Sequence, residues 1–104
     1  MNTLTVSEFQ TKVLDADVVV LKCWAEWCTT CDEILLLVEE FSKTSDVPFY
    51  SVNIGEESEL KDLLKIKTIP ALLFYKNGRL RNFIFGLTTY DEIQRKLNMT
   101  KRSK

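Results

Sequence analysis

The sequence predicts an α/β fold, and three features indicate it. The segment Val18–Trp24 is almost continuously apolar, which is typical of a strand covered on both faces in a parallel sheet. A helical pattern follows from about Thr29 to Lys43, and a second strand spans Phe49–Ile54. This strand-helix-strand order predicts two parallel strands joined by a right-handed crossover. Further along, Asn77-Gly78 lies between two apolar runs and predicts a hairpin with a type I′ turn.

Capping signals place the first elements of the chain. Thr5 and Glu8 have the spacing of a capping box, which predicts a short helix that ends near Leu14. Phe9 falls on the buried side of this helix. Residues 3–5 are expected to form a small edge strand ahead of it.

The second half of the chain continues the alternation of helices and strands. The expected elements are a helix over 56–65, strands over 71–75 and 80–85, and a last helix from a cap at 88–91 to about Asn98. In the helix over 56–65, the inward positions are Leu60, Leu63 and Leu64. The basic residues 101–104 are expected to form a disordered, solubilising tail.

Length and composition limit the kind of protein. With 104 residues, 45% of them hydrophobic, and a net charge of −1, residues 1–104 are expected to form one globular domain. The charge gives no reason to expect binding to nucleic acid or to a membrane. The first residues show no secretion signal, and no stretch reaches the length of a membrane span, so we expect a cytoplasmic protein.

Two cysteines occur in the sequence Cys28-Thr29-Thr30-Cys31, at the junction of a strand and a helix. The unpaired N–H groups and positive dipole end of a helix stabilise a thiolate and lower a cysteine pKa. Helical positions three apart have Cβ atoms roughly 5–6 Å apart, and a small tightening brings them within disulfide reach. The pair can therefore alternate between dithiol and disulfide, which is the requirement for two-electron exchange.

A metal site is the main alternative for this pair, because cytosolic C-x-x-C motifs often bind zinc. A structural zinc ion needs four soft ligands, whereas the sequence contains one further cysteine, Cys23, and no histidine. No metal site is therefore predicted, and Cys23 is interpreted as a small buried apolar residue. The absence of histidine also excludes Cys-His nucleophilic catalysis. Of the two tryptophans, Trp24 is expected in the core and Trp27 on the surface beside Cys28.

These residues resemble the thioredoxin family over nearly the whole chain. The similar segments are Trp24-Ala25-Glu26-Trp27-Cys28 with Cys31, Ile69-Pro70 before a strand, the segment 74–78, and Gly86 before the last helix. The resemblance implies the thioredoxin fold, with a central mixed β-sheet flanked by helices on both faces. It also implies thiol-disulfide exchange on protein substrates, with no cofactor of its own.

The resemblance further implies a role for each matching residue. Cys28 attacks the substrate disulfide, and Cys31 resolves the mixed disulfide. Pro70 follows a cis peptide bond, and Ile69 offers its backbone to the substrate chain. The docking surface also includes Trp27, Thr29 and Gly86. The expected partners are protein disulfide substrates and a flavin-dependent donor of the thioredoxin reductase type, and the expected state is a monomer.

Four positions depart from the family pattern. Thr29-Thr30 replaces Gly-Pro, and the N–H and hydroxyl of Thr30 can bond to a thiolate, which would make the protein more oxidising. Lys22 replaces a buried aspartate that accepts the proton of the resolving thiol, and Ser51 replaces its lysine partner.

Lys22 could act in two ways: as a charged ammonium it favours thiolates, and as a neutral amine it accepts the thiol proton. Its side chain could instead simply extend to solvent. Two other functions remain open at this stage: an oxidase or isomerase, and a redox-weak domain that binds proteins.

Overall fold

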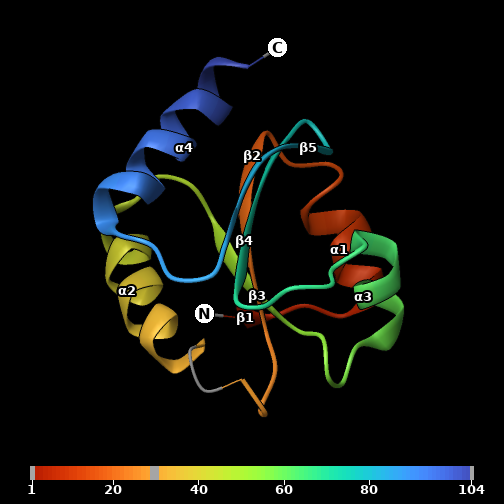
Figure 1. The fold of residues 1–104 in the computed structure, drawn as a ribbon. Coiled ribbons are helices and arrows are strands. Elements are labelled where there is room, and N and C mark those ends of the chain that lie inside the picture. The colour runs from red at the N-terminus through yellow and green to blue at the C-terminus, as the bar shows by residue number, and fades with distance from the viewer. Residues whose placement is uncertain (1, 29–30, 104) are drawn as a thin grey trace.

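The structure is a computed structural model that describes residues 2–28 and 31–103 (Figure 1). Within these ranges, five strands form one mixed sheet in the order β1-β3-β2-β4-β5. The central strand β2 (Val18–Trp24) runs parallel to β3 (Phe49–Asn53) and antiparallel to β4 (Ala71–Lys76). The strand-helix-strand unit predicted from the sequence is therefore confirmed.

Two strands complete the edges of the sheet. A very short strand, β1 (Asn2–Thr3), lies parallel to β3 at one edge. At the other edge β5 (Arg79–Phe85) pairs with β4 in an antiparallel hairpin. Asn77 and Gly78 have φ angles of 53° and 79°, as a type I′ turn requires. Gly78 also allows a close approach, because a Cβ atom there would lie 2.7 Å from the backbone oxygen of Leu14.

Helices cover both faces of the sheet, as expected. On one face lie α1 (Val6–Lys12) and α3 (Ser58–Leu64), and on the other lie α2 (Cys31–Thr44) and α4 (Tyr90–Arg102) (Figure 1). Side chains of β2 alternate between two cores: Val19 and Leu21 belong to the core beneath α1, and Val20 to the core beneath α2. This explains the continuous apolar pattern of that strand. None of the helices in the described ranges is both long and apolar enough to cross a membrane.

The predicted capping box of α1 is present. The Glu8 N–H donates to Thr5 Oγ1 at 3.3 Å, and the Thr5 N–H donates to Glu8 Oε1 at 3.2 Å. The helix ends at Lys12, slightly before the expected end. Phe9 is buried as expected.

The inward position predicted for Leu63 is wrong. Leu63 is 54% exposed, whereas Leu60 and Leu64 are buried. Residues four apart share one face of a helix, and α3 is short, so its contact with the sheet is a narrow stripe that leaves Leu63 outside.

The disordered tail predicted for residues 101–104 is also wrong for its described part. The last helix continues to Arg102, because Ile93, Leu97 and Thr100 form one buried stripe at helical spacing. The Thr100 hydroxyl oxygen accepts a hydrogen bond from Asn82 Nδ2 at 3.0 Å, and Lys101 Nζ lies 2.8 Å from Asp46 Oδ1. These tertiary contacts stabilise the last turn of α4. The polar sequence of this turn gave no local sign that it is helical.

Candidate active site

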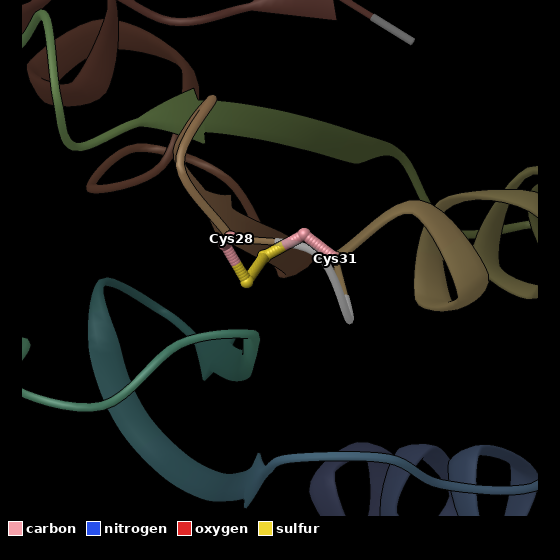
Figure 2. The surroundings of a disulfide bond; sticks show 2 residues. All are labelled: Cys28 and Cys31. Carbon is pink, nitrogen blue, oxygen red and sulfur yellow. A yellow bond between two sulfur atoms is a disulfide. The ribbon is translucent and has the colours of Figure 1, made fainter.

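A disulfide bond joins Cys28 and Cys31, whose Cα atoms are 5.4 Å apart (Figure 2). Cys28 lies four residues after the end of β2, and Cys31 is the first residue of α2. The Cys31 N–H donates to the Cys28 carbonyl oxygen at 3.3 Å, so the pair is held at the first turn of the helix. This is the strand-to-helix position predicted for a reactive thiol.

The two sulfur-bearing residues differ in exposure. Cys28 retains 9% of its surface, whereas Cys31 retains 2%. Both residues are largely buried, and Cys28 is the more accessible of the two to an incoming disulfide.

The peptide bond between Ile69 and Pro70 is cis, which confirms the expectation for Pro70. Ile69 is partly buried and packs against the core beneath α1 and α3. The Pro70 carbonyl oxygen accepts a hydrogen bond of 2.8 Å from the Gly86 N–H. The fold thus brings Gly86 next to Ile69 and Pro70. All three residues were expected at the docking surface.

Trp27 is 71% exposed, as expected for a residue of the surface beside Cys28. Its neighbours Asn53 and Gly55 were not predicted from the sequence as part of this surface. Together with Glu26 and Glu56, these three residues line a cavity of about 160 Å³. The signal that could have found them is the parallel pairing of β2 and β3, because parallel strands end at the same edge of a sheet.

Lys22 is buried, with 2% of its surface exposed, so the expectation that its side chain extends to solvent is wrong. It lines a cavity of about 230 Å³ together with Cys31 and with Trp24, Asp32, Leu35, Glu39 and Ser51. Its ammonium nitrogen lies 5.4 Å from the centre of the Trp24 ring. The strand register pairs Lys22 with Ser51 on β3.

Burial and nearby charges shift the pKa of Lys22 in opposite directions. Burial lowers the pKa of the ammonium group below its usual value, and this is the largest effect. The carboxylates of Glu39 and Asp32 on α2 oppose it, as does the neighbouring Cys23. The helical pattern of the sequence did not by itself reveal that these two carboxylates lie near Lys22.

Cys23 is the free cysteine of the chain, and it is fully buried. Burial raises the pKa of its thiol to about 12, so it stays protonated at neutral pH. This agrees with its interpretation as a small apolar residue. Among the residues that the structure describes, no group of three or more cysteine, histidine or acidic side chains could hold a metal ion. Thr29 and Thr30 lie outside the described residues.

Comparison with known proteins identifies the family. The thioredoxin family model matches residues 1–99. The chain belongs to the thioredoxin family. A thioredoxin of Rickettsia bellii is 35% identical, and the match covers 83% of this chain and 85% of that protein. Thioredoxin M4 of Arabidopsis thaliana, a chloroplastic protein, is 32% identical over 88% of this chain, which spans only 49% of the length of that relative.

Solved structures agree with this family. The thioredoxin of Malassezia sympodialis superposes with a TM-score of 0.86 and 26% identity, covering 96% of this chain and 92% of the other. The thioredoxin of Plasmodium falciparum gives a TM-score of 0.87 and 27% identity, with coverages of 95% and 98%. The thioredoxin fold is confirmed, and with its cysteine pair the chain is a thioredoxin-type thiol-disulfide oxidoreductase.

Proposed function

We propose that this thioredoxin reduces disulfide bonds of other proteins, with Cys28 as the attacking cysteine and Cys31 as the resolving cysteine. The observation that carries the proposal is the disulfide at the start of α2, in which Cys28 is the more exposed partner. A thiol at this end of a helix is acidic, and its exposure decides which sulfur a substrate can reach.

The reaction is a pair of thiol-disulfide exchanges. The Cys28 thiolate attacks one substrate sulfur, a mixed disulfide forms, and the other substrate sulfur leaves as a thiolate that takes up a proton. The Cys31 thiolate then attacks Cys28 Sγ, which closes the internal disulfide and releases the second substrate thiol. The substrate gains two electrons, and a separate dithiol donor, such as a reductase, must return two electrons to the pair.

The substrate chain binds in an extended form beside the disulfide. Ile69 precedes the cis bond at the start of β4, and its backbone supplies the N–H and carbonyl groups that pair with such a chain. We assign Trp27 and Gly86 to the same docking surface, because Trp27 is highly exposed and the Gly86 N–H donates to the Pro70 carbonyl oxygen. We place Thr29 in the same surface because it lies between the two cysteines.

Lys22 accepts the proton of the Cys31 thiol before the resolving step. Three findings support this role: the two residues share one cavity, Lys22 is buried, and its burial favours the neutral amine. The cavity of about 230 Å³ has room for water between them, since one water occupies about 30 Å³ in the liquid. The proton then passes to Asp32 or Glu39 on the way to solvent. Thr30 tunes the same thiols as a hydrogen-bond donor.

Insulin reduction by dithiothreitol tests the activity directly. We expect the protein to accelerate the reaction, the Cys28→Ser variant to lose that acceleration, and the Cys31→Ser variant to accumulate a mixed disulfide. A wild-type protein that adds nothing to the rate of dithiothreitol alone would indicate a domain that only binds proteins. Equilibration with glutathione then gives the reduction potential, and a strongly oxidising value would favour an oxidase or isomerase over a reductase.

A further inference from the structure

Strand β5 carries a stripe of large apolar side chains that remain exposed. Leu80, Phe83 and Phe85 are 45%, 50% and 49% exposed, and we call these three residues the β5 stripe. The strand lies at the edge of the sheet. Exposed apolar side chains on an edge strand favour association with other chains unless something covers them.

The strand register shows that the β5 stripe lies on one face of the sheet. Its members pair across the strands with Tyr75, Leu73 and Ala71 respectively, and these partners all belong to the core beneath α1 and α3. Directly paired residues of neighbouring strands share a face. An irregularity at Phe74 and Tyr75 brings Leu80 onto this face, although its sequence spacing from Phe83 is odd.

The helices on this face cover β4 but leave the β5 stripe open. Phe9 of α1 packs edge-on against Tyr75, with ring centres 6.0 Å apart. By contrast, Phe83 and Phe85 pack against each other, with ring centres 4.9 Å apart, and each keeps about half of its surface exposed. On the sheet face that carries α1 and α3, the aromatic side chains of β5 are therefore not covered by a helix.

One end of the β5 stripe adjoins the proposed substrate position. Phe85 is followed by Gly86, whose N–H donates to the Pro70 carbonyl oxygen at 2.8 Å. Ile69 packs against the same core as the strand partners of the stripe. A substrate chain bound at Ile69 could therefore continue along β5 without leaving the surface.

The charges along strand β5 indicate the chemistry of its occupant. The strand carries two basic residues, Arg79 and Arg81, and no acidic residue. Arg79 pairs with Lys76 at the turn end of the hairpin, on the face opposite the stripe, so its charge lies along the edge of the sheet. Exposed Lys67 lies in the loop that leads to Ile69. Two copies of this chain that paired along β5 would bring four arginine side chains onto one edge, whereas a partner with carboxylates would complement them.

We propose that the β5 stripe is a second docking surface, which binds an apolar segment with flanking acidic residues in the protein substrate. This inference rests on the proposed reduction of protein disulfides. The substrate disulfide meets Cys28, while the neighbouring segment of the same substrate packs on Phe83 and Phe85. The stripe thereby selects substrates by sequence outside the disulfide and leaves the chemical step unchanged.

Three synthetic disulfide peptides test the proposal: a short one, one extended by a Leu/Phe/Glu segment, and one extended by a Ser/Lys segment of equal length. We expect the wild-type protein to show a KM roughly tenfold lower for the Leu/Phe/Glu peptide, with kcat unchanged. The double variant Phe83→Ala, Phe85→Ala should lose this preference and keep its KM for the short peptide. Leu36→Ala removes a side chain that is 68% exposed on α2 and is the matched control.

The possible results separate the two proposals. No turnover of the short peptide would refute the proposed reductase function. Normal turnover with equal KM values for the two extended peptides, or a preference that persists in the double variant, would overturn the role of the β5 stripe alone. Sedimentation that shows a wild-type dimer, dissociated by the double variant, would assign the stripe to a second copy and overturn the proposal as well. Unchanged far-ultraviolet circular dichroism confirms that the variants fold.

Discussion

Lys22 and Cys31 line the same cavity, although one lies in the central strand and the other begins α2. Asp32 and Glu39 line the same cavity. We expect a basic group that shares a cavity with the resolving cysteine to affect that cysteine more than the attacking one. The first three predictions follow from this arrangement.

Replacing Lys22 should raise the pKa of the Cys31 thiol. In a Cys28→Ser background, Lys22→Met removes the proton acceptor and the ammonium charge that forms beside the thiolate when the proton is accepted, so we expect an increase of about one unit or more. The thiolate absorbance in the ultraviolet, followed against pH, measures this. Lys22→Arg keeps the charge but cannot accept a proton, so it should restore the pKa without restoring the rate of the resolving step. A titration curve that is unchanged in Lys22→Met would contradict the proposed role.

Glu39→Gln should shift the pH dependence of the resolving step to lower pH. The Glu39 carboxylate favours the charged form of Lys22, so its removal lowers the pKa of Lys22 further. The amine then becomes neutral, and able to accept a proton, at a lower pH. The decay rate of a mixed disulfide, measured across pH, tests this prediction. Glu40→Gln is the control, because Glu40 is exposed and pairs with Lys43 at 3.2 Å; an equal shift in both variants would exclude a local effect.

Lys22→Met should also stabilise the fold at neutral pH. Burial lowers the pKa of Lys22 in the folded state, so the unfolded chain binds more protons at this site, and folding stability falls as pH drops below about 10.4. Replacement by an apolar side chain removes this cost, by about 1–4 kcal/mol. Urea unfolding should show a higher free energy of unfolding for Lys22→Met than for the wild type. This difference should shrink as the pH rises toward the pKa of an unperturbed lysine side chain.

The exposed Lys43 provides the control for this stability measurement. Lys43→Met should change the free energy of unfolding by less than about 0.5 kcal/mol, because surface substitutions have small effects. A Lys22→Met protein that is less stable than the wild type at pH 7 would indicate that the ammonium group is well paired in the folded state.

Cys23 should remain unmodified while the protein is folded. Its thiol is fully buried and has a pKa of about 12, so little thiolate exists for reaction with iodoacetamide at pH 8. Mass spectrometry of the reduced protein should show a label on Cys28 in buffer and a label on Cys23 only in denaturant. Rapid labelling of Cys23 in buffer would mean that the core beneath α1 opens easily.

Much of the architecture was predictable because its signals are local. The apolar run of β2, the capping box at Thr5 and Glu8, and the turn at Asn77-Gly78 each depend on neighbouring residues, and the structure confirms all three. The placement of Cys28 and Cys31 at a helix start also follows from such patterns. The cis bond before Pro70 was expected only from the family resemblance. One domain over 1–104, a monomeric state and a cytoplasmic location stay predictions.

By itself, the sequence determined the strands, the helix starts and the reactive pair, since hydrophobic periodicity and turn chemistry act over a few residues. Only the tertiary structure decided that Lys22 is buried and shares a cavity with Cys31, that Gly86 bonds to Pro70, and that Leu80 joins Phe83 and Phe85 on one face. These relationships arise where distant segments pack together. The free energy of each contact depends on burial and on strand register, and a pattern of neighbouring residues does not specify either of them.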